Sequence, residues 1–266
     1  MSKKRMPYLS YTGFTKYETC PQAYYQEYIL GQRPDIEDAR NFFTGNALHK
    51  LLEDYIHNKD DDPQWIIDNA EPYWHEEVEV QPLIKWRNDD DADELLGKMI
   101  KWSKSLAGLV VEAKIKPEQW QTELKIDSPV NLFGTTVKMG GRVDLLRKKE
   151  NGDVIFFDLK GSENRSIMKL DQIVWYSTVL GVYLDDMTQP RAGGYILPGF
   201  NEIKLYEVSD KNKMSLLRRV HKAFQGIKQQ KWDAPVGGCK DFWCIVHGRG
   251  AQPTLENKNG IITLGG

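Results

Sequence analysis

Two apolar, strand-like runs of this sequence end in charged side chains that could do chemistry. GGRVDLL carries Asp144, and VIFFDLK carries Asp158 and Lys160. Because successive side chains of a strand point to opposite faces, Asp158 and Lys160 share one face of theirs. The second run is apolar on both faces up to its carboxyl end. We therefore expect a buried strand whose charged pair emerges at the rim where α/β sheets usually bind ligands.

The segment ENGD joins the two runs, and an Asn-Gly turn between alternating runs predicts a β-hairpin. The hairpin makes Asp144 a cross-strand neighbour of Asp158, and two adjacent carboxylates repel unless a cation or a proton lies between them. A hard divalent ion, Mg²⁺ or Mn²⁺, suits Asp144, Asp158 and the carbonyl of Leu159, and leaves positions for water and phosphate oxygens. Lys160 would then orient an attacking water or balance the developing charge. A surface hairpin with an ordinary Asp–Lys ion pair remains the alternative.

The elements that must position these residues follow from the periodicity of the sequence. Residues 10–29 predict two short helices interrupted at Pro21, and GNALHKLLEDYI predicts a helix opened by Gly45 and Asn46. Strand-like alternation begins after Trp120. Further along lie a helix in SIMKLDQIVWYSTVLGVYL, a strand in AGGYILPG and a basic amphipathic helix in KNKMSLLRRVHKAFQGIKQQKW. Such an order predicts a mixed sheet with helical cover.

The composition limits the function classes. Lys and Arg total 36 against 38 Asp and Glu, so a nucleic-acid surface would have to be local. No apolar run approaches the roughly 20 residues that span a bilayer, and no apolar stretch follows the basic amino terminus. We expect a cytoplasmic protein without a membrane partner, and its three Cys favour a reducing compartment. Two acidic runs, NKDDDPQ and RNDDDADE, are typical of solvated helix starts.

Four segments in order, GNALHKLLEDY, GRVD, DLK and QIVWY, resemble the PD-(D/E)XK nuclease superfamily. The resemblance extends from Tyr11 to about His247 and is to the RecB-like exonuclease branch, which includes the CRISPR adaptation nucleases and many phage exonucleases. It implies an α/β fold of the restriction-endonuclease type, with a mixed central sheet flanked by helices. We expect a single nuclease domain over 1–266, consisting of a mainly helical part (1–115), a catalytic sheet core (116–205), and a basic helix with a Cys-containing tail (206–266).

The resemblance also implies roles for individual residues. His49 matches the helical His that completes the metal shell of the family, and an imidazole beside carboxylates makes Mn²⁺ attractive as well as Mg²⁺. Asp144 and Asp158 match the two acidic ligands, and Lys160 matches the catalytic Lys. Without the family, a lone His beside an apolar stripe is more often a core or boundary residue.

Three further residues of this sequence match positions of the family's pattern. Gln172 and Tyr176, four residues apart on one helix face, match the Gln-x-x-x-Tyr thought to position the Lys, the site water or the DNA strand. Ordinary helix packing is the alternative for this pair. Glu123 in QTEL lies where the family often has an acidic strand residue, although an exposed Glu is common.

Relatives often hold a [4Fe–4S] cluster with one Cys before the nuclease core and three after it. Cys20, Cys239 and Cys244 match three of these positions, and the expected fourth Cys is absent. His247 could replace it, and a Cys₃His set also binds zinc. Unligated thiols, packed in a core, are the remaining alternative.

Taken together, these features predict a metal-dependent DNA nuclease, an exonuclease on single strands or duplex ends, directed by a helicase, recombinase or integrase partner. A phage protein acting in the host cytoplasm fits the same pattern. The rivals are a DNA-binding or complex-forming module that retains the fold without turnover, and a sequence-specific endonuclease. The basic helix after residue 210 is either a solvated face or a source of contacts with the nucleic-acid backbone.

Overall fold

The computed structural model divides into two compact units. The first contains Met1–Ile36, Asn131–Val137 and Leu217–Gly266, and the second contains Glu37–Val130 and Lys138–Leu216. The residues that the structure describes are 8–32, 40–58, 61–80, 86, 88, 90–148, 153–184, 192–233, 239, 244, 246, 255–258 and 261–264. The single domain expected over 1–266 stays a prediction.

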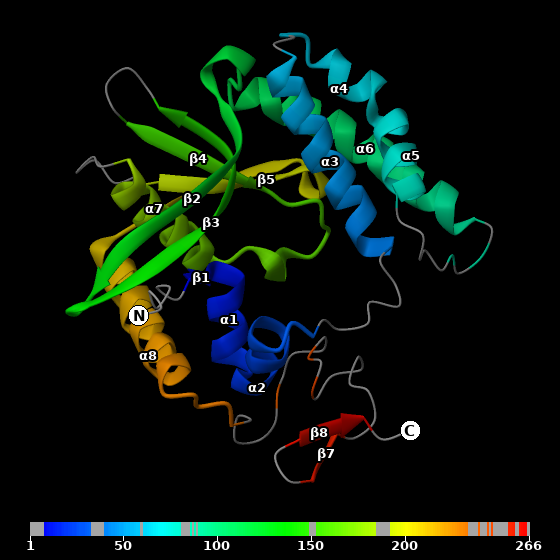
Figure 1. Ribbon diagram of the computed structural model, residues 1–266. Helices are drawn as coiled ribbons and strands as arrows, with labels where there is room; N and C mark the ends of the chain where they lie inside the picture. Colours follow the sequence, from blue (N-terminus) through cyan, green and yellow to red (C-terminus); the bar gives the residue numbers. More distant parts are fainter. Residues whose placement is uncertain are drawn as a thin grey trace. The chain divides into compact units, whose positions relative to one another are not determined.

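A mixed β-sheet forms the centre of the second unit (Figure 1). Residues of this unit form the larger parts of β2 (Gln121–Leu132) and β3 (Thr135–Lys148), together with β4 (Val154–Leu159), β5 (Ala192–Leu197) and β6 (Glu202–Glu207). The order β3–β4–β5–β6 alternates antiparallel, parallel and antiparallel pairing, and β2 pairs with β3. The predicted mixed sheet is thus confirmed, whereas β6 was not predicted.

Helices cover both faces of this sheet. The helices of the second unit are α3 (Arg40–His57), α4 (Gln64–Asp68), α5 (Ala70–Val80), α6 (Asp91–Glu112) and α7 (Leu170–Tyr183), with short 3₁₀ turns at Pro117–Gln119, Arg165–Ile167 and Pro198–Phe200. On β4, Phe157 and Leu159 join the core formed with α3 and α6, while Phe156 meets the ring of Tyr176 on α7. The mixed α/β fold with flanking helices is therefore confirmed.

Helix α3 begins at Arg40 and not at Gly45, where the sequence had predicted its start. Phe43 and Ala47 are buried and extend the apolar stripe of Leu48 and Leu51 by one turn toward the amino terminus. A Cβ added at Gly45 would meet no atom within 4 Å, so the helix does not require glycine there to avoid a clash. Packing of the extended stripe thus outweighs the weak helix propensity of glycine.

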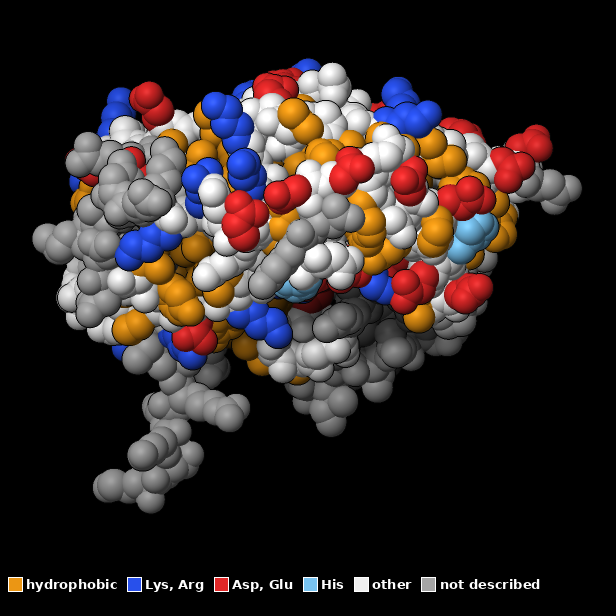
Figure 2. Space-filling model, turned by 90° about the horizontal axis from the view of Figure 1, so that it is seen from above, with side chains coloured by type: hydrophobic (Ala, Val, Ile, Leu, Met, Phe, Trp, Pro, Cys, Tyr) orange, Lys and Arg blue, Asp and Glu red, His pale blue; other side chains and the backbone are white. Residues whose placement is uncertain are grey.

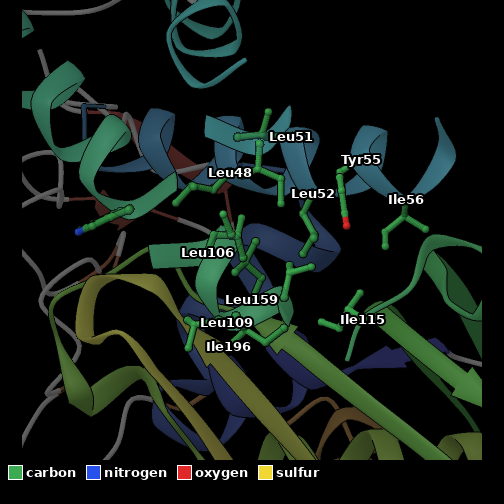
Figure 3. Packing of buried hydrophobic residues seen from close by; sticks show 14 of the residues in the cluster. Leu48, Leu51, Leu52, Tyr55, Ile56, Leu106, Leu109, Ile115, Leu159 and Ile196 are labelled. Atoms are coloured by element: carbon green, nitrogen blue, oxygen red, sulfur yellow. The ribbon is translucent and has the colours of Figure 1, made fainter. Parts of the chain in front are cut away.

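The main hydrophobic core lies between α3, α6 and the sheet (Figure 3). Leu48 and Leu51 of α3 point toward Leu106 of α6, with Leu159 and Ile196 of the sheet on the other side. His49 lies next to this stripe on α3, so the core fixes the helix from which its imidazole projects.

Replacing Leu51 with Ala tests how firmly this core holds α3. Leu51 is fully buried, so we expect the free energy of unfolding to fall by about 2–5 kcal/mol. Urea denaturation measures the change, and replacing the exposed Val111 of α6 with Ala, which should change it by less than about 0.5 kcal/mol, is the control.

The first unit begins with β1 (Tyr8–Ser10) and two short helices, α1 (Tyr11–Thr19) and α2 (Pro21–Tyr24). The Ser10 hydroxyl accepts a hydrogen bond from Gly13 N and so caps α1. The break at Pro21 confirms the predicted interruption. A π-helical turn (Tyr25–Ile29) follows, and α8 (Asp210–Lys228), β7 (Leu255–Lys258) and β8 (Ile261–Leu264) lie toward the carboxyl end.

Acidic side chains spread over the right-hand part of the face in Figure 2, where α4, α5 and α6 lie. Asp91, Asp93 and Glu94 occupy the first turn of α6, which agrees with reading the run RNDDDADE as a helix start. None of the described helices combines the length and the apolar character needed to cross a membrane.

Candidate metal and active site

Asp144 of β3 and Asp158 of β4 face each other across the predicted hairpin. The antiparallel register pairs Leu145 with Phe157, so continuing it by one residue places the two aspartates opposite one another. The backbone N–H of Leu159 donates to Asp144 Oδ2 at 2.8 Å. The turn residues 149–152 lie outside the described residues, but the strands on both sides are paired as predicted.

Both carboxylate oxygens of Asp158 have a partner. Lys160 Nζ lies 2.6 Å from Oδ2, and Gln172 Nε2 donates to Oδ1 at 3.0 Å. Lys160 and Asp158 therefore lie on the same side of the chain, as their spacing had predicted. Gln172 comes from the first turn of α7, so that helix positions the Asp158 carboxylate directly.

Tyr195 of β5, which sequence reasoning did not single out, holds this first turn of α7 in place. Its hydroxyl accepts from Lys169 N at 3.2 Å and lies within donating distance of Lys169 O (2.8 Å) and Gln172 Oε1 (3.2 Å). Lys169 is the N-cap of α7 and offers no side-chain cap. The fully buried Tyr195 thus takes over part of the capping and supports the amide that binds Asp158.

His49, Glu123 and Asp144 form a second, overlapping group. His49 Nδ1 lies 3.6 Å from Glu123 Oε1 and 3.6 Å from Asp144 Oδ2. One potential ligand atom from each of the three side chains lies within 4.8 Å of the other two. One imidazole nitrogen and two carboxylate oxygens from three separate elements are a donor set that fits Mn²⁺ or Mg²⁺.

Glu123 reaches this group because the backbone of β2 departs from strand geometry there. Its φ of 51° lies in the left-handed region, which is unusual for a residue with a Cβ. Regular alternation would place Glu123 on the same face as the exposed Lys125 and Asp127. The irregular residue instead turns Glu123 toward His49, and Arg142 Nε lies 2.5 Å from its other oxygen.

The electrostatics of the site reflect an excess of buried negative charge. Burial, followed by the charge of Asp158, raises the pKa of Asp144 to about 7. Burial alone would lower the pKa of His49, but the contact with Glu123 and the charges of Asp144 and Asp158 raise it above its usual value. Burial alone would raise the pKa of Glu123, but the hydrogen bond with His49 and the charge of Arg142 lower it below its usual value. A proton or a cation is therefore bound favourably between these groups near neutral pH.

The remaining predicted residues of the core lie nearby with different surroundings. Tyr176 is buried against Gly141 of β3, where an added Cβ would come within 2.8 Å of its ring, and against Phe156 of β4. The side chain of Leu159 belongs to the hydrophobic core. Roles for Tyr176 and for the Leu159 carbonyl in chemistry stay predictions.

The three cysteines converge in the first unit. Cys20, Cys239 and Cys244 bring their sulfur atoms within 4.8 Å of one another. Burial is the main cause that raises the pKa of Cys20 to about 12, and the neighbouring thiols add to it. Cys20 Sγ also accepts a hydrogen bond from Ala23 N at 3.4 Å. His247, proposed from the sequence as a fourth ligand, lies outside the described residues.

Comparison with known proteins identifies the family. A profile of the PD-(D/E)XK nuclease superfamily matches residues 8–244. Among solved structures, the crystal structure of SSO0001 is similar over 68% of this chain and 85% of its own, with 20% sequence identity and a TM-score of 0.30. No curated protein matches the chain.

Proposed function

Because the chain belongs to the PD-(D/E)XK nuclease superfamily, we propose that it is a Mg²⁺- or Mn²⁺-dependent deoxyribonuclease of the RecB-like branch, acting as an exonuclease in the cytoplasm. The observation that carries the proposal is the convergence of His49, Glu123 and Asp144. The Asp158–Lys160 pair adjoins this group through Asp144. We further propose that a helicase, recombinase or integrase directs the nuclease to its DNA.

In this proposal His49, Glu123, Asp144 and Asp158 hold the ion, with the carbonyl of Leu159 as a further oxygen. A bound divalent ion would polarise the scissile phosphate and lower the pKa of the attacking water. The protein residues keep their ligand atoms in place beforehand: Gln172 restrains Asp158, Arg142 restrains Glu123, and Leu159 N restrains Asp144.

Lys160 acts in this proposal as a cation and not as a base. Burial would lower the pKa of its ammonium, but the charge and hydrogen bond of Asp158, together with Asp144, raise it above the usual value. A lysine that keeps its proton can balance the charge that develops on the phosphate and hydrogen-bond to its oxygens. It cannot accept the proton of the attacking water.

Cleavage assays on labelled DNA test the proposal. We expect linear single-stranded or blunt duplex DNA to be shortened from its ends with Mn²⁺ or Mg²⁺, to stay intact in EDTA, and covalently closed circles to survive. Cutting of circles at a defined site would instead indicate a sequence-specific endonuclease. DNA that is bound but uncut with every metal would indicate a module without turnover.

Replacing Tyr195 with Phe removes one hydroxyl and keeps the ring. We expect the cleavage rate at saturating DNA to fall about tenfold with little change in KM, because residues that orient metal ligands typically contribute 10–100-fold. Tyr206, whose ring packs edge-on against Tyr195, provides the matched control: Tyr206→Phe should cleave at the wild-type rate. Equal cleavage rates for both variants would contradict a role of Tyr195 in positioning Gln172 and Asp158.

We also propose that Cys20, Cys239 and Cys244 hold an iron–sulfur cluster, with a fourth ligand from elsewhere, His247 being the candidate. Two buried thiols and one half-buried thiol gathered at this distance suit such a site or a zinc ion. Protein purified without oxygen should be brown and contain iron and acid-labile sulfide, and Cys20→Ser should lose both. If the purified protein contains stoichiometric zinc, or no metal, the proposal of an iron–sulfur cluster is wrong.

A further inference from the structure

We infer that the first unit contains a separate binding site for single-stranded DNA, in a pocket between α1 and α8. The inference rests on the proposed function, because that function makes DNA the ligand. The pocket has a volume of about 560 Å³, which lies in the usual range for ligand sites. Tyr17, Glu18 and Pro21 line one side, and side chains from Arg219 to Lys231 line the other.

A close approach of two segments builds the wall of this pocket. The Tyr17 hydroxyl donates to Lys231 O at 2.9 Å, which ties α1 to the chain just after α8. Gly226 of α8 is buried beneath Tyr17, and a Cβ at this position would overlap the phenol oxygen. Glycine here therefore permits a contact that any other residue would prevent.

The pocket is locally positive in a protein with a net charge of −2. Residues 217–233 contain five Lys or Arg and a single acidic residue, Asp233. Arg219 pairs with Glu18 through both carboxylate oxygens, so this acid is neutralised within the wall. Lys222 and Lys231 form no ion pair with any described residue. Two ammonium groups and the amides of the lining Gln residues can therefore bind phosphates.

Aromatic side chains beside the pocket favour a single strand over a duplex. The rings of Tyr24 and Tyr28 stack at 4.9 Å, and Trp232, which follows the pocket residue Lys231, stacks on Tyr24 at 6.1 Å. Tyr28 keeps 44% of its surface exposed, and Ile29 and Leu30 after it are exposed as well. Unpaired bases stack on exposed rings, whereas the bases of a duplex are already stacked on each other. A site for single-stranded DNA needs cations that bind the phosphates and aromatic rings on which the bases stack, and the two lie beside each other here.

Binding measured in EDTA tests the site without cleavage. With a labelled oligothymidylate of about 20 nucleotides, we expect Lys222→Ala/Lys231→Ala to weaken binding about tenfold in fluorescence anisotropy. The slope of log K against log salt should become shallower by about 1.4, since each phosphate contact on a single strand contributes about 0.7. Arg218→Ala/Lys228→Ala removes the same charge from α8 outside the pocket and should change binding by less than about twofold.

Stacking is tested separately with Tyr28→Ala. We expect it to weaken binding of the single strand about tenfold and to leave binding of a duplex of equal length unchanged. Tyr183 on α7 is also 44% exposed, so Tyr183→Ala is a matched control that should affect neither DNA. Equal losses for the two pairs of cations, or no loss with Tyr28→Ala, would overturn the inference.

Cleavage by the same variants separates this inference from the proposed function. If the wild type cuts DNA with Mn²⁺ while Lys222→Ala/Lys231→Ala binds the single strand as tightly as the wild type, the pocket is not a binding site for single-stranded DNA. The nuclease proposal then stands. If no metal supports cleavage but the pocket variants still lose binding, the nuclease proposal fails and the binding site stands.

Discussion

Replacing Lys160 with Ala is expected to reduce DNA cleavage by about 10²–10³-fold, the loss typical of removing one group that stabilises transition-state charge. Affinity for Mn²⁺ should not decrease, because the variant removes a positive charge from beside the cation site. Lys160 lies 2.6 Å from a nearly buried Asp158. Its loss should therefore also lower the free energy of unfolding without metal by about 1–3 kcal/mol.

Two further substitutions make the Lys160 experiment specific. Lys160→Arg keeps the charge beside Asp158 but replaces a point charge by a planar fork, so stability should recover while most of the activity stays lost. Lys138→Ala breaks a surface ion pair with Asp127 on the outside of the sheet and should leave cleavage unchanged. Turnover of Lys160→Ala at the wild-type rate would contradict the electrostatic role.

Local periodicity was sufficient to predict the pairing of Asp144, Asp158 and Lys160. Strand alternation and an Asn-Gly turn fix which side chains share a face and which strands are neighbours, and both rules depend only on nearby residues. Gln172 could be predicted from its family motif, and the structure places its amide on Asp158. The mixed sheet could be predicted from the order of helices and strands, because local periodicity distinguishes the two.

Local periodicity does not predict the positions of Glu123 and Tyr195. Alternation assigns Glu123 to the exposed face, and only the left-handed backbone at that residue turns it inward. Tyr195 lies in the apolar run GGYIL, where an aromatic residue indicates core packing, and its partners on α7 are more than 20 residues away. Strand β6 escaped prediction because EIKLYE is a half-exposed edge strand with mixed polarity. In each case tertiary contacts, and not local pattern, decided the outcome.

Asp144→Asn is expected to change stability in opposite directions with and without metal. Burial and Asp158 raise the pKa of Asp144 from 3.8 to about 7. An acid with a higher pKa in the folded state binds its proton more tightly there. The free energy of unfolding therefore falls as the pH rises from about 4 to about 7 and stays low above that range.

Asparagine cannot ionise, so Asp144→Asn avoids this loss and can still accept the hydrogen bond from Leu159 N. In EDTA the variant should match the wild type near pH 4 and exceed its free energy of unfolding at pH 8 by about 2–4 kcal/mol. Thermal or urea unfolding at both pH values measures the difference. Asp127→Asn, on the exposed pair with Lys138, should show no such pH dependence.

Saturating Mn²⁺ should reverse the order of stability. A ligand at 1,000 times its Kd stabilises the wild type by about 4.1 kcal/mol, which exceeds the advantage of about 2–4 kcal/mol that the variant has in EDTA. The variant lacks one carboxylate ligand, so it should gain much less from Mn²⁺ and cleave no DNA. A buried carboxylate that binds a metal ion is expected to destabilise the folded protein when the metal is absent. If Asp144→Asn is less stable than the wild type in EDTA at pH 8, Asp144 is a structural carboxylate, and the metal site must be sought around other residues.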